Sequence, residues 1–234
     1  MAAETQVLVD NEKKYIAKFF SDASESDVKK VDLSTLSWAK HTITLSGAAS
    51  PNFKIGEVLT VGSEKYLVTG FTAGASTVEV VGWDNTNKKA TAIDASSSNG
   101  DAVSGGVSGN NTRTYSSIAE QDFNVLVTKI MWITNGLQVA IEWDGSGSEA
   151  YIAELSGNGS WSMPGNEWPG IGINASGDSG NVLGDIQFST TGHASGDSYT
   201  IIMELKKQSG YDIPAYEQNN ILGYPVDYLL GNFT

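Results

Sequence analysis

The sequence predicts an all-β protein: an antiparallel β-sandwich, jelly-roll-like, with a second small β-barrel-like module and extended terminal arms. Apolar residues recur mostly at every second position, which is the period of a half-buried strand. Short runs rich in β-branched and aromatic residues alternate with turns of Gly, Asn and Ser. The 234 residues include no cysteine, so the core must form without disulfides. A chain of this length buries enough surface to do so.

The barrel-like module is expected over residues 38–93, after an N-terminal segment of strands or an arm over 1–37. Its apolar runs are short and are separated by tight glycine turns, which is typical of a small barrel. The runs are 41–45, 58–61, 65–69 and 76–83. Gly62 and Ser63, between the second and third runs, predict a β-hairpin.

A linker is expected over residues 94–112. This stretch is rich in Gly, Ser and Asn, and only Val103 and Val107 interrupt its polar run. Such a composition cannot bury a core and is typical of a flexible connection. We therefore expect a domain boundary here.

The sandwich is expected over residues 113–210, with six or seven antiparallel strands. The strand-like runs are 123–133, 137–143, 150–155, 160–163, 185–190 and 198–205. Asn135 and Gly136 separate the first two runs, and this dipeptide favours the type I′ turn of a β-hairpin. Glycine-containing turns over 156–159 and 191–197 repeat the pattern.

The C-terminal arm, residues 211–234, is unusually apolar for a chain end. Its two prolines, Pro214 and Pro225, disfavour a continuous helix or a central strand. A disordered tail would be polar and poor in aromatic residues. We therefore expect the arm to lie on its own domain or on a neighbouring subunit. The side chains expected to make that contact are Tyr211, Tyr216, Ile221, Leu222, Tyr224, Tyr228, Leu229 and Phe233.

Composition argues against several classes of partner. The net charge is −13 and Arg113 is the single arginine, which disfavours binding to nucleic acid phosphates. No apolar run approaches the roughly 20 residues needed to span a bilayer. The first ten residues lack the basic and apolar regions of a signal peptide. We expect no nucleic acid partner, no membrane segment and no secretion signal.

Candidate catalytic residues are few. His41 and His193 are the two histidines, and no Gly-x-Ser-x-Gly turn accompanies them. Glu142 and Asp144 flank Trp143 and would share one side of a strand, so a glycosidase-like pair needs a surrounding cleft. An exposed polar face explains the same spacing. We expect no catalytic residue and no cofactor.

A metal site is not expected either. The segment 174–181 is rich in oxygen ligands and could hold calcium through backbone carbonyls and Asp178. The same residue types build ordinary turns, and we favour that interpretation.

Carbohydrate binding is an alternative of another class. Six tryptophans are present, and aromatic rings stack on sugars. Trp161 and Trp168 flank the loop 162–167, where an exposed platform could form, and are the possible glycan contacts. Trp132 and Trp143 are expected to face a core.

Three segments resemble virion structural proteins of tailed bacteriophages, across about residues 123–207. They are 130–145, 154–161 and 192–202. That family includes capsid decoration (cement) proteins and neck or tail components. The resemblance implies partners among other virion proteins, such as the major capsid protein or neck and tail proteins, and carries over no catalytic residue.

The sequence thus predicts a non-enzymatic structural protein of a phage virion. The favoured role is that of a capsid decoration protein that stabilises the head through subunit contacts. A neck or tail protein is the alternative within the same class. We expect a homo-oligomer, located in the virion and assembled in the host cytoplasm. An acidic β-protein with an apolar arm suits such assembly, since edge strands and arms bind neighbouring subunits.

Overall fold

The computed structural model describes residues 3–49, 52–93, 97–106, 113–120, 123–145, 150–163, 170–172 and 182–211. Within these ranges the regular structure is β-strand, apart from the short 3-10 helix η1 (Leu33–Thr35), so the all-β prediction is confirmed. The chain divides into two compact units. The first joins residues 1–33 to 123–209, and the second holds residues 34–122 with Gly210 and Tyr211. In the described part no helix is long and apolar enough to cross a membrane.

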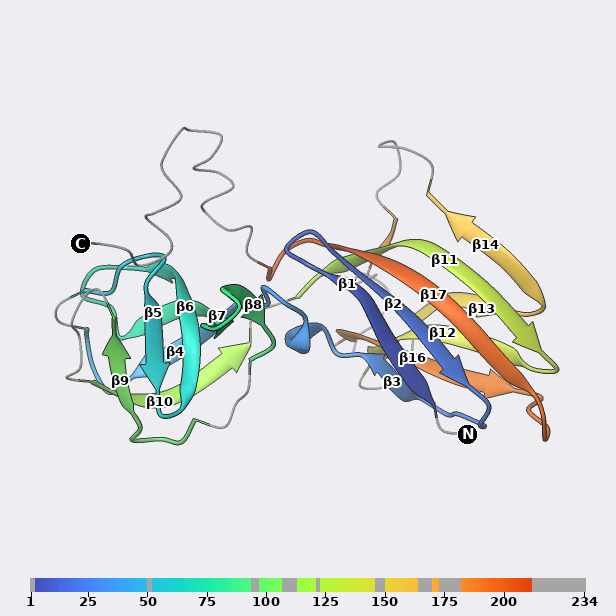
Figure 1. The fold of residues 1–234 in the computed structure, drawn as a ribbon, viewed down its shortest axis with the longest axis horizontal. Helices are drawn as coiled ribbons and strands as arrows, with labels where there is room; N and C mark the ends of the chain where they lie inside the picture. The colour runs from blue at the N-terminus through green and yellow to red at the C-terminus, as the bar shows by residue number, and fades with distance from the viewer. Residues whose placement is uncertain are drawn as a thin grey trace. The chain divides into compact units, whose positions relative to one another are not determined.

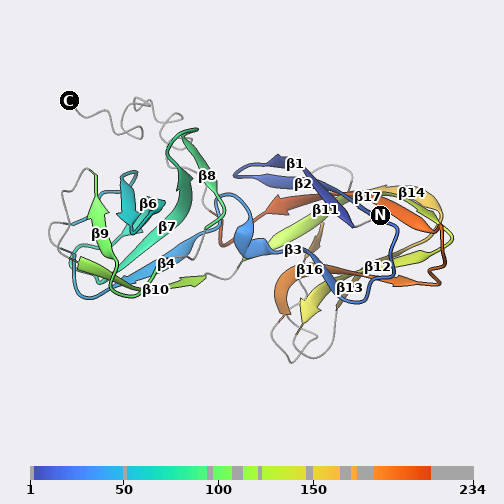
Figure 2. The same cartoon turned by 60° about the horizontal axis from the view of Figure 1, so that its bottom comes forward.

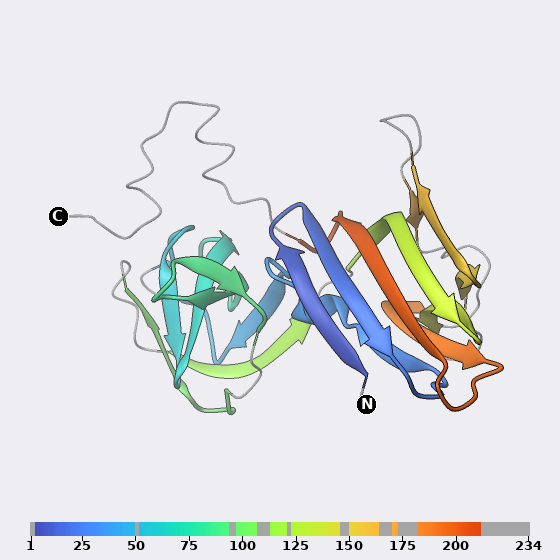
Figure 3. The same ribbon diagram turned by 45° about the vertical axis from the view of Figure 1, so that its right-hand side comes forward.

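The first unit consists of two antiparallel sheets (Figures 1 and 3). Sheet A has the strand order β1-β2-β17-β11-β14, and β15 also pairs with β11. Sheet B has the order β13-β12-β16-β3. The strands of sheet A are β1 (Glu4–Asp10), β2 (Lys14–Ser21), β11 (Val125–Asn135), β14 (Asn158–Ser162), β15 (Ile171–Gly172) and β17 (Ser198–Lys207). The strands of sheet B are β3 (Val28–Val31), β12 (Gln138–Gly145), β13 (Ala150–Leu155) and β16 (Val182–Thr191).

The pairing of these strands is nested, which is the topology of a jelly roll. Strand β2 pairs with β17, and β3 pairs with β16. Inside these pairs, β11 pairs with β14 and β12 pairs with β13. Eight strands from two chain segments therefore wrap around each other, with partners that are far apart in sequence. The jelly-roll-like sandwich predicted from the sequence is present.

The core of the sandwich lies between the two sheets. Strands β2 and β17 alternate buried and half-buried residues along most of their length, as expected when one face is covered. Phe188 of sheet B packs edge-to-face on Phe19 of sheet A at 5.2 Å, and its ring centroid lies 6.0 Å from that of Tyr199. Trp143 is fully buried, as predicted. Figure 2 shows β12, β13 and β16 as a layer apart from β2, β11 and β17.

The hairpin predicted at Asn135 and Gly136 is wrong. Strands β11 and β12 flank this turn, but β11 belongs to sheet A and β12 to sheet B. A type I′ turn needs positive φ at both central residues. Gly136 has φ 78°, whereas Asn135 is not among the described residues with positive φ. The chain therefore arches from one sheet to the other. The turns at 156–159 and 191–197 also connect different sheets.

The second unit is a closed antiparallel barrel. Its sheet has the order β4-β10-β9-β5-β6-β7-β8, and β4 also pairs with β7, so six strands form a ring with β8 outside it. The strands are β4 (His41–Leu45), β5 (Val58–Val61), β6 (Glu64–Phe71), β7 (Thr77–Asp84), β8 (Lys89–Thr91), β9 (Ala102–Gly105) and β10 (Arg113–Glu120). Val61 is opposite Glu64, so the hairpin predicted at Gly62 and Ser63 is confirmed.

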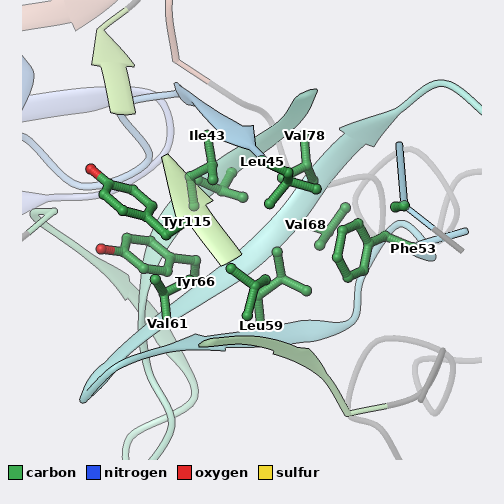
Figure 4. Packing of buried hydrophobic residues seen from close by; sticks show 12 residues of the cluster. Ile43, Leu45, Phe53, Leu59, Val61, Tyr66, Val68, Val78 and Tyr115 are labelled. Carbon is green, nitrogen blue, oxygen red and sulfur yellow. The ribbon is translucent and has the colours of Figure 1, made fainter. Parts of the chain in front are cut away.

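Two apolar clusters stabilise the barrel. The interior one includes Ile43, Leu59, Tyr66 and Val78, all almost completely buried (Figure 4). A smaller cluster joins Trp38, Leu67, Val81 and Ala90, with Trp83 packed against it. The rings of Trp38 and Trp83 meet edge-to-face with 6.5 Å between centroids.

The predicted domain boundaries differ from those of the structure. The 94–112 segment is not simply a linker, because β9 pairs with β5 and β10 through its backbone. Backbone pairing is indifferent to composition, so a glycine- and serine-rich strand can complete a ring. Strand β10, expected in the sandwich, also belongs to the barrel. The barrel is inserted between β3 and β11, and β1 to β3 from the expected N-terminal arm are strands of the sandwich.

The arch at Gly136 can be tested by substitution. A Cβ there would lie 1.9 Å from Asp197 Oδ1, and Asp197 Oδ2 accepts the Ala194 N–H at 2.7 Å. Gly136→Ala should therefore combine the cost of positive φ with loss of this turn, about 2–3 kcal/mol in the free energy of unfolding. The measurement is urea unfolding followed by tryptophan fluorescence.

The matched control is Gly157→Ala. Gly157 also has positive φ, 65°, but a Cβ there meets nothing within 4 Å. Only the conformational cost of about 1 kcal/mol is expected. Equal losses in the two variants would contradict a steric role for Asp197.

Candidate interaction surface

The outer face of sheet A carries an apolar patch that no described residue covers completely. Because side chains alternate along a strand, the outward residues follow from the register. In one row Phe20 is opposite Thr200, and Thr200 is opposite Ile133. In the next row Lys18 is opposite Ile202, which is opposite Met131. We call this surface the sheet A face; its residues are Ile16, Lys18, Phe20, Lys129, Met131, Ile133, Thr200, Ile202 and Glu204.

Two apolar side chains of this face are exposed. Ile133 is 63% exposed and Met131 is 41% exposed, while Ile16, Phe20 and Ile202 are half-buried. A sheet with one covered face normally presents polar residues on the other. Contiguous exposed apolar surface marks interaction sites more often than isolated residues do.

A shallow depression of about 440 Å³ lies on this part of the sheet. Its lining combines apolar side chains of β11 and β17 with polar residues of β14, and consists of Met131, Trp132, Ile133, Asn158, Gly159, Ser160, Thr200 and Ile202. The Trp132 ring lies against Gly159, where a Cβ would come within 2.4 Å of the ring, and its Nε1 donates to the Ser156 carbonyl at 3.2 Å.

The sheet A face carries more lysines than carboxylates, although Glu204 lies on it opposite Lys129 and Glu4 is opposite Phe20. Lys18 and Lys129 lie among its apolar residues, and Lys14 and Lys206 face each other directly beyond them. Neither Lys18 nor Lys129 makes an ion pair with any residue that the structure describes. The whole chain has a net charge of −13. Acidic segments of the chain are therefore opposite in charge to the lysines of this face.

Beneath the face, polar groups are buried but paired. Glu25 accepts hydrogen bonds from the Tyr199 hydroxyl and the Lys30 ammonium, both at 2.7 Å. Lys30 also lies over the rings of Phe188 and Tyr199, at 5.9 and 6.0 Å from their centroids. This cluster joins β3 of sheet B to β17 of sheet A, so the layer under the face is fixed on both sides.

A second buried cation lies near the other end of β17. Lys207 is paired with Asp10 at 2.5 Å, and its side chain is fully buried. Burial lowers the pKa of Lys207, while the neighbouring Asp10 carboxylate opposes that change. Burial also raises the pKa of Tyr15 to about 12, and Asp10 acts in the same direction. The pKa of Tyr199 is raised strongly, first by burial and then by its hydrogen bond to Glu25.

The predicted aromatic sites are only partly placed. Trp161 is half-buried and opposite Ile130, which points into the sandwich, so it does not lie on the sheet A face. Trp168 lies outside the described residues. The platform predicted from these two tryptophans is therefore represented by Trp161 alone.

The predicted arm begins on the barrel. Tyr211 is 7% exposed and forms a β-bridge with Ala39, and the Lys40 N–H donates to the Gly210 carbonyl at 2.8 Å. Tyr211 is therefore a contact of its own unit, contrary to its expected place in the interface. The other predicted contacts lie outside the described residues: Tyr216, Ile221, Leu222, Tyr224, Tyr228, Leu229 and Phe233.

Glu142 and the two histidines, considered above as catalytic candidates, lie among ordinary structural contacts. Glu142 is 2% exposed and is opposite Gln187 in sheet B. His41 is buried with Nδ1 3.2 Å from the Ala39 carbonyl, and His193 Nε2 lies 3.1 Å from the Asp22 carbonyl. The part of the chain that the structure describes holds no group of three or more His, Cys, Asp or Glu side chains that could bind a metal. The candidate calcium segment, 174–181, lies outside the described residues.

Comparisons with known proteins identify no relative. No protein-family model and no curated protein matches this chain. Among solved structures, one similarity is to a chain from a structure of manganese lipoxygenase of Gaeumannomyces graminis with part of zonadhesin of Komagataella pastoris. The identity is 9%, the match covers 90% of this chain and 84% of that chain, and the TM-score is 0.13. At that score the match carries no argument.

Sequence reasoning did not identify the sheet A face. The signal was present in the unbroken apolar run from Ile130 to Ile133, since a strand with one solvated face should alternate. The run predicts a strand, and within it Trp132 is expected to face a core. Only the register shows that Met131 and Ile133 point outward.

The buried tyrosines predict loss of stability at high pH. A tyrosine whose pKa is raised by folding stabilises the protein below its unfolded pKa near 10, and this contribution is lost as the pH rises through the folded value. For Tyr15 the window is pH 10 to about 12. The expected loss is about 1.4 kcal/mol per pH unit for each buried tyrosine.

The measurement is urea unfolding of the wild type and of Tyr15→Phe between pH 8 and pH 11.5. The difference between them cancels the opposite contribution of Lys207, which the two proteins share. Tyr15→Phe should show the shallower decline. Parallel pH profiles would contradict the burial of this hydroxyl.

Proposed function

We propose that this chain is a non-enzymatic structural protein of a phage virion. Among such proteins, we favour a capsid decoration protein that stabilises the head through subunit contacts. The observation that supports this best is the apolar sheet A face, with Ile133 and Met131 exposed on a rigid sandwich. A fold that already buries its core between two sheets has no use of its own for such a surface. An assembly subunit does.

The fold is compatible with this proposal. Jelly rolls occur in viral capsid proteins and in lectins, so the topology permits both classes and selects neither. The proposal of a capsid protein instead of a lectin is supported by the sheet A face and by the composition of residues 212–234. Apolar surface in both places favours contact with proteins, because each patch gains free energy only when it is covered.

A decoration protein can bind its particle through a small apolar interface on each subunit. A standard interface buries about 800 Å² on each partner. Symmetric particles repeat each contact many times, so a small free energy per subunit is sufficient. The resemblance of residues 123–207 to virion proteins agrees with this role, and other virion proteins are the proposed partners.

The proposal predicts self-association or particle binding that depends on apolar surface. Ile133→Asp should reduce association at least about tenfold, because a buried carboxylate costs more than 1.4 kcal/mol. The measurements are sedimentation equilibrium for self-association and co-sedimentation with capsids that lack this protein. Ile133 is exposed, so circular dichroism should be unchanged.

The control is Tyr151→Asp, at an exposed residue of sheet B. It should associate as the wild type does. A wild-type protein that stays monomeric at high concentration and ignores capsids would overturn the proposal. Binding to isolated necks or tails in place of capsids would favour the alternative location within the virion.

Carbohydrate binding remains the candidate of another class. The observation in its favour is the depression beside Trp132, whose lining includes the polar side chains of Asn158, Ser160 and Thr200. Tryptophan fluorescence titrated with simple sugars tests it. A saturable change that Trp132→Phe abolishes would favour this alternative, and a flat titration would set it aside.

A further inference from the structure

We propose that the sheet A face binds the C-terminal segment, residues 212–234, of a second copy of this chain. This inference rests on the proposed assembly function and names the contact through which copies would join. It is drawn from the chemistry of the two surfaces, the face described above and the segment as its sequence presents it.

The two surfaces match in polarity. The face presents Ile133 and Met131 on β11 and Ile202 on β17, in two adjoining rows. The segment supplies apolar side chains of complementary kind, among them Leu229, Leu230 and Phe233. Covering both removes apolar area from water on each side.

The two surfaces are also opposite in charge. Lys18 and Lys129 stand within the face and have no ionic partner among the described residues. The segment contains Asp212, Glu217 and Asp227 and neither lysine nor arginine. Two sheet A faces, in contrast, would share the same excess of lysine over the Glu204 carboxylate. Charge therefore favours the segment over a face-to-face dimer.

The segment is long enough for the contact. Five strands at about 4.8 Å spacing make sheet A roughly 20 Å wide. An extended chain gains about 3.3 Å per residue, so six or seven residues cross the sheet. The remaining part of the 23-residue segment can connect two copies. Pro214 and Pro225 suit an extended conformation of this kind.

The absence of cysteine from the 234-residue sequence allows a direct test. One preparation carries Ile133→Cys and a second carries Leu229→Cys, and the two are mixed and treated with a short bismaleimide. We expect a covalent dimer containing one copy of each variant, identified by mass spectrometry. The control replaces the first variant by Tyr151→Cys, whose side chain is 71% exposed on the other sheet. Its yield should be roughly tenfold lower, because nothing holds the two thiols close together.

Charge reversal provides a second measurement. Lys18→Glu with Lys129→Glu should reduce the Ile133–Leu229 cross-link at least about threefold at low salt, where screening is weak. Replacing Asp212, Glu217 and Asp227 by lysine in the other copy should restore it. Lys18 and Lys129 lie on the solvent side of their strands, so the fold is expected to be retained.

The outcomes separate this inference from the proposed function. No excess cross-link over the Tyr151→Cys control, in a protein that still associates or binds capsids, overturns the inference and leaves the proposed function standing. A protein that neither associates nor cross-links overturns both. Cross-linking only within one chain, in the doubly substituted Ile133→Cys, Leu229→Cys variant, overturns the exchange between copies.

Discussion

The nested pairing of the jelly roll is the constraint on which the other features of the first unit depend. Because β2 pairs with β17 and β3 with β16, the first 33 residues and the last strands must come together before the core is complete. The contact of Phe19 with Phe188 joins the two sheets inside this frame. Once the inner faces form the core, the outer faces carry little packing constraint. Apolar residues on an outer face therefore call for an explanation outside the fold.

The same pairing accommodates the inserted barrel. Residues 34–122 leave the sandwich after β3 and the chain re-enters it at β11, so the jelly roll tolerates a whole folded unit within one connection. The barrel closes its own ring through the pairing of β4 with β7 and needs no edge strand from outside. Gly210 and Tyr211 bond to residues 39–40 of the barrel, so both ends of this unit are held together. Each unit thus has its own core and its own closure.

Buried polar groups of the sandwich also join segments that are far apart in sequence. Glu25, in the connection before β3, accepts hydrogen bonds from Lys30 of β3 and Tyr199 of β17 under the sheet A face. A buried ion pair of this kind adds little net stability but strongly penalises arrangements that separate its members. It therefore fixes how β3 lies against β17. A fixed sheet presents Ile133 and Met131 with little loss of side-chain and backbone freedom on binding, which favours association.

The sequence alone determined where most of the strands lie, because a strand with one covered face requires apolar residues at every second position. It also located the hairpin at Gly62 and Ser63, where neighbours in sequence are partners in the sheet. It could not determine which strands pair across the sandwich, since Asn135 and Gly136 allow either a hairpin or an arch and local propensity does not distinguish them. Only the tertiary structure decided that β11 and β12 separate into two sheets, that the polar β9 completes the barrel, and that Met131 and Ile133 face outward. The outward direction of Met131 and Ile133 depends on the pairing of β11 with β17, more than 60 residues away, and β9 pairs with β5 about 40 residues away. No local pattern records such partners.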